Sequence, residues 1–337
     1  MIQEAIKKVV DRKDLDRAEA VEVMKEIMSG GATEAQISCL ITALRMKGET
    51  IEEITGFACT MREFAVKVRA ETSSGLIVDT CGTGGDVSGT FNISTCSVFV
   101  TAGAGVTVAK HGNRSVSSKC GSADLMEAIG VRLDMPVEKI EQSLREIGLA
   151  FLFAPKMHPA MKHAIGPRKQ IAVRTVFNIL GPMTNPAGAN AQVMGVYTPD
   201  LVEPLANVLN NLGTKHSFVV HGSGLDELAL TGETRVSEIT EGRVKNYVIS
   251  PGDYGLKQCS LEDLRGGDAG ANLDILTGIL KGDKGPKRDA VLLNAAAAIT
   301  AGGAAKDIKE GIRIAEDSVD SGKAMKKMEA LRDFSAG

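Results

Sequence analysis

The sequence predicts an α/β protein in which a small N-terminal all-helical domain, residues 1–72, precedes a larger α/β domain, residues 73–337, with a mainly parallel central sheet flanked by helices. Helix-capping motifs and helical apolar spacing fill the first part. From about residue 73, short apolar runs alternate with helical patterns, as in a parallel sheet with helical crossovers. A chain of 337 residues, 43% of them hydrophobic, is long enough for one large domain or two.

Three capping boxes mark the helices of the N-terminal part. They lie at residues 16–19 (DRAE), 33–36 (TEAQ) and 50–53 (TIEE), where an N-cap oxygen and a side chain three residues later satisfy each other's backbone donors. Apolar residues recur at helical spacing behind each box. Because so small a bundle leaves apolar surface uncovered, we expect it to pack on the rest of the chain, joined by helices from about 158–181, or on a second subunit.

Beyond residue 73, expected strands and helices alternate. The expected strands are 75–78, 106–109, 192–197, 217–221 and 243–249. The expected helices are 94–102, 124–129, 137–147, 201–212, 289–302 and 304–334. The segment 158–180 has a helical pattern but many Arg, His, Lys and Asn residues, and it lies beside Pro182 and Pro186. This combination predicts a hinge.

Charge and composition exclude several classes of protein. The 39 basic and 42 acidic residues give a net charge of −3, which predicts no broad surface for nucleic acid, so any phosphate binding must be local. The longest apolar run, 291–299, is too short to cross a bilayer, and no signal peptide is evident, so we expect no membrane partner and a cytoplasmic location. The six cysteines lack metal-site spacing and are interpreted as reduced thiols, with no catalytic role for Cys81 or Cys120.

A glycine-rich segment, residues 79–86 (DTCGTGGD), is the most informative part of the chain. It follows the apolar pair Ile77-Val78 and precedes a helix expected to start near Asn92. Open α/β sheets bind anions where a strand's carboxyl end meets a helix start, and glycine lets the backbone approach phosphate oxygens. With the cationic loop 110–118, this segment predicts a site for a doubly phosphorylated ligand.

Three common motifs are excluded by spacing. The dinucleotide fingerprint GxGxxG would need glycine where Val87 stands, and the nearest Gly-Lys pair of the Walker kind, at residues 322–323, is followed by Ala324. His221, Ser223 and Asp226 lack the Gly-x-Ser-x-Gly elbow of a hydrolase.

The most specific blocks resemble the anthranilate phosphoribosyltransferases. They are residues 81–86, 92–95, 110–124 (KHGNRSVSSKCGSAD), 174–186 (RTVFNILGPMTNP) and 221–227 (HGSGLDE). The resemblance covers essentially the whole chain, from the helical start to the Ala-rich helix near 294. It implies transfer of the 5-phosphoribosyl group from 5-phosphoribosyl 1-diphosphate (PRPP) to the amine of anthranilate, a step of tryptophan biosynthesis.

The resemblance implies that PRPP lies between the glycine-rich loop and the loop from Lys110. The residues implied around it are Gly82, Gly85, Asp86, Thr90, Asn92, Ile93, Ser94, Thr95, Lys110, His111, Gly112, Asn113, Arg114, Ser115, Val116, Ser117, Ser118 and Ser122. No covalent nucleophile is implied. Positioning of the two substrates and stabilisation of the leaving diphosphate would supply the rate.

Two magnesium ions per active site, with the donor bound, are also implied. Ser94 would contact one ion, and Asp226 and Glu227 would hold the second. Mg²⁺ prefers carboxylate and phosphate oxygens and keeps several waters, so a pair of adjacent carboxylates near phosphates suits it. Glycines 222 and 224 beside the pair favour a built site over a solvated acidic surface.

For anthranilate, the resemblance points to Gly82, Asn113 and Arg168, with His111, His158 and Pro159 near the channel. A guanidinium can bind a carboxylate through two parallel hydrogen bonds, which suits Arg168. By residue type alone, Arg168 and Arg174 would be read as surface charges.

Two other functions are weighed against this one. A pyrimidine nucleoside phosphorylase is similar in fold and breaks a ribosyl bond, but the full 110–118 block and the acidic pair favour a diphosphate donor with magnesium. The second alternative, a non-catalytic relative that binds nucleic acid, would need a basic surface, and the near-neutral net charge argues against it. The resemblance also implies a homodimer formed through the N-terminal helices. Association with a glutamine amidotransferase subunit stays open.

The chain departs from the family pattern at Ile171-Ala172, where Leu-Gly is common. We expect the extra methyl of Ala172 to crowd the helix beside the hinge.

Overall fold

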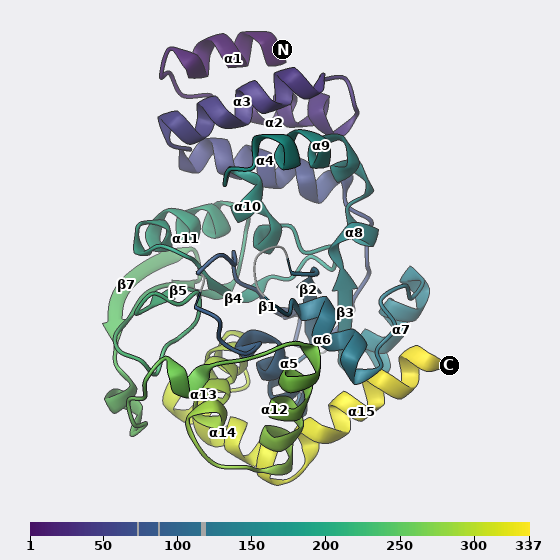
Figure 1. Ribbon diagram of the computed structural model, residues 1–337, viewed down its shortest axis with the longest axis vertical. Coiled ribbons are helices and arrows are strands. Elements are labelled where there is room, and N and C mark those ends of the chain that lie inside the picture. Colours follow the sequence, from purple (N-terminus) through teal and green to yellow (C-terminus); the bar gives the residue numbers. More distant parts are fainter. Residues whose placement is uncertain (73, 87, 116–118) are drawn as a thin grey trace.

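Three helices of the N-terminal part (Figure 1) each begin with a capping box, as predicted. The computed structural model describes residues 1–337 except 73, 87 and 116–118. The three helices are α2 (Arg17–Met28), α3 (Glu34–Lys47) and α4 (Ile51–Phe64). A further helix, α1 (Ile2–Val10), was not predicted, and no side-chain cap marks its start. It buries Ile2, Ala5 and Val9.

The larger part is built on a seven-stranded sheet with the order β3-β2-β1-β4-β5-β6-β7. The strands are β1 (Val78–Thr80), β2 (Val108–Gly112), β3 (Leu149–Phe153), β4 (Ala191–Gly195), β5 (His216–Gly222), β6 (Thr234–Thr240) and β7 (Arg243–Ile249). The first five strands in this order pair in parallel, and β6 and β7 add antiparallel pairs. The predicted α/β class with a mainly parallel sheet is confirmed, although β3 and β6 were not predicted.

Helices cover the faces of this sheet. They are α5 (Ile93–Gly103), α6 (Ser122–Ile129), α7 (Val137–Glu146), α11 (Val202–Asn211), α12 (Ala269–Lys281), α13 (Pro286–Ala301), α14 (Ile308–Asp320) and α15 (Lys323–Ala336). The α5 and α13 helices are almost wholly buried and lie against each other beneath the sheet, with α14 and α15 outside them (Figure 1). The helix expected at 304–334 is two helices, because Gly322 takes a positive φ of 75° and ends α14.

An apolar core joins the helical part to the sheet. One cluster of buried side chains runs from α1–α4 through Phe177 and Leu180 to α11 and to Val219 of β5. Arg62 of α4 adds hydrogen bonds from Nε to the Met183 carbonyl, 2.7 Å, and from Nη1 to the Leu212 carbonyl. The surplus apolar surface of the small bundle is thus partly covered by the rest of the chain.

The segment between β3 and β4 is broken into short helices. They are α8 (Ala154–Met157), the 3₁₀ turns η1 (Pro159–Met161) and η2 (Gly181–Met183), α9 (Lys162–Ile171) and α10 (Phe177–Leu180). The α9 helix packs against α2 and α3, where Gln170 donates to Glu34 over 3.1 Å. A Cβ at Gly30 would meet the His163 ring at 2.7 Å, so the two elements approach closely. Three further 3₁₀ turns are η3 (Pro199–Leu201), η4 (Pro251–Tyr254) and η5 (Glu262–Leu264).

None of the helices in the described part of the chain has the length and apolar character needed to cross a membrane.

Ala172 ends α9 in a left-handed conformation. Its φ is 51° and its ψ is 26°, the region that glycine occupies at many helix ends. The side chain is exposed, so the expectation that its methyl crowds the helix was wrong. The cost of alanine here lies in the backbone, since a Cβ disfavours positive φ.

We expect Ala172→Gly to raise the free energy of unfolding by about 1 kcal/mol, because glycine adopts this conformation without the Cβ penalty. Urea denaturation followed by circular dichroism measures the change. Val173→Gly is the matched control, since Val173 is also exposed but its φ is not positive. Stabilisation by both substitutions, or by neither, would contradict the backbone explanation.

Candidate active site

The glycine-rich loop follows β1 at the point where the sheet order changes direction. The chain passes from β1 to β2 on one side, whereas β4 and β5 lie on the other, so β1 and β4 flank the kind of crevice in which open α/β sheets bind ligands. The loop runs beside β4, with Cys81 N–H bonded to the Val193 carbonyl and Thr83 N–H to the Gly195 carbonyl, 3.1 and 2.9 Å. The α5 helix then begins with Asn92 as its N-cap. A strand end, a glycine loop and a helix start therefore meet as the sequence predicted.

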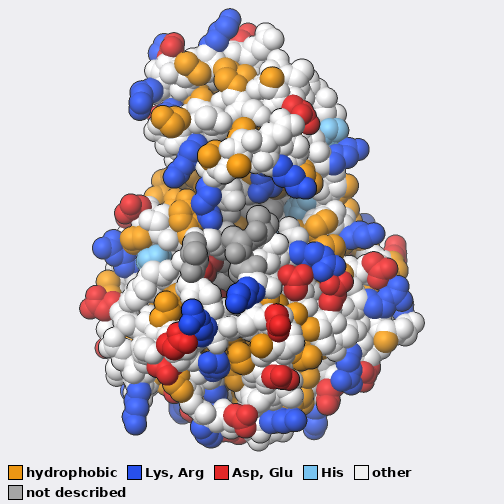
Figure 2. Space-filling model, in the orientation of Figure 1, with side chains coloured by type: hydrophobic (Ala, Val, Ile, Leu, Met, Phe, Trp, Pro, Cys, Tyr) orange, Lys and Arg blue, Asp and Glu red, His pale blue; other side chains and the backbone are white. Residues whose placement is uncertain are grey.

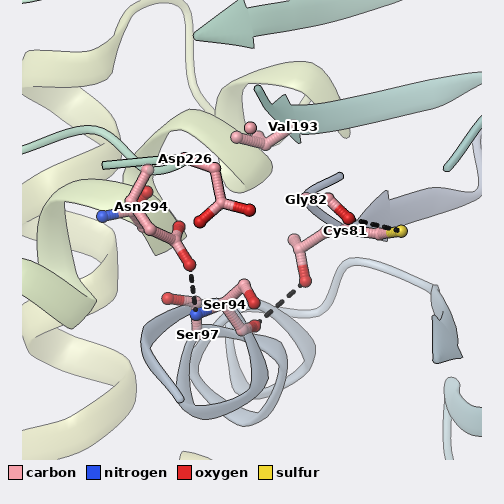
Figure 3. A pocket seen from close by; sticks show the side chains of 10 residues that line it. Cys81, Gly82, Ser94, Ser97, Val193, Asp226 and Asn294 are labelled. Carbon is pink, nitrogen blue, oxygen red and sulfur yellow. Dashed lines mark hydrogen bonds between the residues drawn. The ribbon is translucent and has the colours of Figure 1, made fainter. Parts of the chain in front are cut away.

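Two adjacent carboxylates, from the loop after β5, face this glycine loop (Figure 3). An Asp226 oxygen, Oδ2, accepts the Gly84 N–H over 2.8 Å, and Glu227 Oε1 accepts the Ser94 N–H over 3.1 Å. Asn294 of α13 fixes their loop by bonding both the N–H and the carbonyl of Leu228. The structure thus brings Ser94, Asp226 and Glu227 together.

Close approach of the two loops depends on missing Cβ atoms. A Cβ at Gly82 would overlap the Asp226 carboxylate, and one at Gly195 would overlap the Asp226 backbone. The small pocket between the loops is lined by Thr80, Cys81, Gly82, Ser94, Ser97, Val193, Gly195, Asp226, Glu227 and Asn294 (Figure 3).

Burial makes both carboxylates hard to ionise. It raises the pKa of Glu227 to about 8, with a further rise from the Asp226 charge and opposition from Lys110. Burial, with the nearby Asp86 charge, raises the pKa of Asp226 to about 6. A bound cation would relieve this unfavourable arrangement. Two carboxylates close together are a donor set that suits a hard cation that also takes oxygens from a bound ligand. Among the described residues, no group of three or more His, Cys, Asp and Glu side chains able to hold a metal occurs.

Lys110 places a buried positive charge beneath the glycine loop. Its Nζ donates to the Thr80 carbonyl, and burial raises the pKa of the neighbouring Asp79 to about 6 against the opposing effect of Lys110. Asp79 is itself held by the Asn185 amide at 2.8 Å and by the His111 N–H at 3.2 Å. The network fixes the end of β2, from which the cationic loop leaves.

The other residues predicted to surround PRPP include those between the glycine-rich loop and the first turn of α5. Ser88 donates to Asp86 over 2.7 Å and lies 3.3 Å from Thr90 Oγ1. Asn92 donates to the Cys120 carbonyl and accepts from Asn272. The side chains of Ile93 and Thr95 are buried in the α5 core.

The start of the cationic loop is tied to α6. The Ser122 hydroxyl accepts the Asn113 N–H at 3.2 Å, next to Gly112. The Ser115 N–H bonds to Asp124, and the exposed Arg114 side chain is paired with Asp124 and Glu127. Val116, Ser117 and Ser118 lie outside the described residues.

The predicted acceptor residues come from the glycine-rich loop (Gly82), from β2 and the residue after it (His111 and Asn113), from the turn before α9 (His158 and Pro159) and from α9 itself (Arg168). The His111 and His158 rings lie 5.1 Å apart, and burial lowers their pKa values to about 3 and about 4, so both are neutral at pH 7. The Nε2 atom of each is buried without a hydrogen-bond partner among the described residues. His158 precedes η1, which starts at Pro159. Each of these Nε2 nitrogens is thus free to bond to a bound molecule or a water.

Arg168 is half-buried on α9, with its guanidinium 5.4 Å from the centre of the Phe177 ring. Burial lowers its pKa, and it forms no ion pair with any residue that the structure describes. The interpretation of Arg168 and Arg174 as surface charges was wrong, since Arg174 is also half-buried and bonds the glycine loop. Figure 2 shows Lys and Arg side chains gathered around the hollow between the helical part and the α/β part.

Sequence reasoning missed Asn185 and Asn294. Both are buried amides that hold site segments through partners 106 and 66 residues away along the chain, and no local motif marks such a role.

Two family descriptions match this architecture. "Glycosyl transferase family, helical bundle domain" matches residues 3–65, and "Glycosyl transferase family, a/b domain" matches residues 74–325. Fold and site thus define a glycosyl transferase of two parts. The chain is 56% identical over 344 aligned positions to anthranilate phosphoribosyltransferase of Geobacter sulfurreducens, with 98% of both chains covered. It belongs to the anthranilate phosphoribosyltransferase family.

Solved structures agree with this assignment. The enzyme of Thermus thermophilus is 43% identical, with a TM-score of 0.94 and 99% of both chains covered. The Saccharomyces cerevisiae enzyme in complex with PRPP and Mg is 27% identical, with a TM-score of 0.91 and coverage of 99% of this chain and 98% of that one. The yeast enzyme has also been solved in complex with 4-fluoroanthranilate, at 26% identity and a TM-score of 0.89, covering 99% of this chain and 97% of that one.

We expect the Glu227 carboxyl to contribute a fall in the free energy of unfolding of the metal-free protein as the pH rises from about 5 to about 8, whereas His111 and His158, whose pKa values are lowered by burial, contribute a rise below about pH 6.5. A Glu carboxyl ionises near 4.5 when unfolded but near 8 at position 227, so the folded state holds an extra proton in this range and loses stability as that proton leaves. Glu227→Gln removes the titrating group and should flatten the fall. Urea denaturation in EDTA across this range measures it, and equal slopes for the two proteins would contradict the assignment.

Proposed function

We propose that this protein transfers the 5-phosphoribosyl group from PRPP to the amine of anthranilate, giving N-(5-phosphoribosyl)anthranilate and diphosphate. The observation that carries the proposal is the pair Asp226-Glu227 held against the glycine loop and the Ser94 N–H at the switch point of the sheet. Family membership supports the same reaction. The reaction would belong to tryptophan biosynthesis.

Diphosphate binding is assigned to the loops after β1 and β2. Backbone N–H groups of the glycine loop and the start of α5 can bind phosphate oxygens, and the α5 dipole favours negative charge there. Gly82, Gly85 and Asn92 would line this side, while Lys110 supplies a positive charge from below. The chain's small net charge makes such local placement necessary, because no general positive field attracts the donor.

Ser94, Asp226 and Glu227 would hold magnesium, with two ions per site when the donor is bound. The buried carboxylates with raised pKa values support this assignment, since a divalent cation would favour their ionised forms. Magnesium, when bound, neutralises charge on the diphosphate oxygens as that group leaves.

The acceptor is assigned to the side of α9. Arg168, which has no ion pair among the described residues, would bind the anthranilate carboxylate through paired hydrogen bonds. The neutral rings of His111 and His158, with Asn113, Gly82 and Pro159, would shape the channel. The aniline-type amine reaches the site uncharged, so its nitrogen can bond to the anomeric carbon while the bond from that carbon to the diphosphate breaks on the opposite face. The proton that the nitrogen then loses passes to the departing diphosphate or to water, so no strong protein base is needed.

We also propose a cytoplasmic homodimer that pairs through the N-terminal helices. Val10 of α1 and Met46 of α3, which are 60% and 70% exposed, offer apolar surface on neighbouring helices for such a contact. All six cysteines are free, as suits a reducing compartment. We further propose that residues 1–72 move as one domain, that the helices from about 158–181, which join it to the rest of the chain, contain the hinge, and that closure excludes water.

The activity is tested by mixing purified protein with anthranilate, PRPP and MgCl₂ and following the loss of anthranilate fluorescence. We expect loss that needs both PRPP and magnesium, with the product confirmed by mass. EDTA and donor-free reactions are the controls. A folded protein that binds PRPP but leaves anthranilate unchanged would overturn the proposal and point to another acceptor.

Arg168→Ala should raise the KM for anthranilate about 10- to 100-fold, because a charge-assisted hydrogen bond contributes that much binding. The KM for PRPP should change far less. Lys169→Ala is the matched control, since Lys169 is the exposed neighbour on α9. Steady-state kinetics with each substrate varied decides the assignment, and an equal rise in both KM values would refute it.

A further inference from the structure

Arg174 lies where the segment after α9 meets the glycine-rich loop. One guanidinium nitrogen, Nη2, lies 2.8 Å from the Gly84 carbonyl oxygen and 3.5 Å from that of Thr83. The guanidinium carbon is 4.1 Å from the centre of the Tyr197 ring, just beyond β4. A planar guanidinium can donate from its edge while its face rests on an aromatic ring. Arg174 thus connects the loop to the strand beside it.

The loop is shaped to receive this side chain. Gly85 has a φ of 85°, and a Cβ built on it would overlap Nη1 of Arg174. Gly84, its neighbour, has a φ of 64° but no atom near the place a Cβ would take. Of these two adjacent glycines, only Gly85 must therefore lack a side chain for the guanidinium to fit.

Arg174 differs from the arginines that hold the scaffold together. Arg17 pairs with Glu52 at 2.8 Å, and Arg288 pairs with Asp320 at 2.6 Å. Within the described ranges Arg174 pairs with no carboxylate, and its Nε–H is buried without a hydrogen-bond partner. Its guanidinium contacts the loop carbonyls and the Tyr197 ring, and these contacts hold the loop in place.

Both backbone polar groups of Gly84 are hydrogen-bonded. Its N–H is bonded to Asp226, and its carbonyl is bonded by Arg174. Asp226 is a proposed metal ligand, so its bond to the loop competes with that role. The Arg174 bonds use only backbone oxygens and stay available whatever Asp226 binds.

Arg174 also follows the helix that carries Arg168. The α9 helix ends at Ile171, is fixed on α2 and α3, and is separated from Arg174 only by Ala172 and Val173. A short, direct connection therefore runs from the acceptor-side helix to the donor-side loop.

We propose that Arg174 is a positioning residue that clamps the glycine-rich loop in its donor-binding shape and ties it to the segment bearing Arg168. The proposal rests on the proposed function for its kinetic consequence. Its structural consequence, an ordered loop in the substrate-free protein, does not depend on which reaction is catalysed.

The first test is the Arg174→Ala protein. We expect the KM for PRPP to rise about 10-fold or more, as for loss of a charge-assisted hydrogen bond, while the KM for anthranilate changes less than about 3-fold. Hydrogen exchange of a peptide covering residues 79–86, without substrates, should become faster. Arg174→Lys, which keeps a cation but not the planar fork, should lie between wild type and alanine.

A double-mutant cycle isolates the contact. Gly85→Ala should raise the PRPP KM strongly in wild type but much less in the Arg174→Ala background, where no guanidinium remains to be displaced. Gly84→Ala is the matched control, because its added methyl meets open space and its effect should be the same in both backgrounds.

The outcomes separate the two proposals. If wild type is inactive with PRPP and anthranilate, the proposed function fails, and the hydrogen exchange still decides the clamp. If wild type is active but Arg174→Ala leaves both the PRPP KM and the loop exchange unchanged, the clamp is refuted. A rise confined to the anthranilate KM would make Arg174 an acceptor ligand and would also refute it, as would additive effects of Gly85→Ala and Arg174→Ala.

Discussion

The approach of the Asp226-Glu227 loop to the glycine-rich loop is the contact on which the site depends. It places two buried carboxylates against backbone N–H groups, and it is possible only because Gly82 and Gly195 carry no Cβ. The seven-stranded sheet supplies the geometry, since β1, β4 and β5 end at one edge. Ordinary side chains at these glycines would separate the loops and take the two carboxylates away from the backbone N–H groups.

Electrostatics explains why so much charge is buried at this edge. Asp79, Asp226 and Glu227 all have pKa values raised by burial, which is unfavourable for a protein that binds nothing. Lys110 offsets part of this cost from beneath the loop. The cations that accompany a phosphorylated donor would offset the remaining cost of burying these carboxylates. A protein of net charge −3 needs such a local arrangement of charges to bind a polyanion.

The helical part shares an apolar core with the sheet and packs against the helix that carries Arg168. Its apolar core continues through α10 and α11 to the sheet, and α9 carries Arg168, whose guanidinium lies over the Phe177 ring. Arg174 then reaches the glycine loop two residues after α9 has turned at Ala172. The proposed acceptor and donor sides are therefore connected through a short stretch of backbone, an arrangement that would suit a reaction between two bound substrates.

The sequence by itself determined the three capped helices, the glycine-rich segment and the α/β class, because capping boxes, glycine positions and the alternation of strand and helix patterns are all written along the chain. Capping boxes bond residues three apart, and the glycine loop follows its own strand. Strand β3 was missed because a short apolar run such as Leu149–Phe153 has no period that separates strand from helix. Only the tertiary structure decided how Asn185, Arg174 and Asn294 act, since their partners lie some 66 to 106 residues away along the chain. It also decided the raised pKa values of Asp226 and Glu227, because burial is a property of the packed chain rather than of any motif.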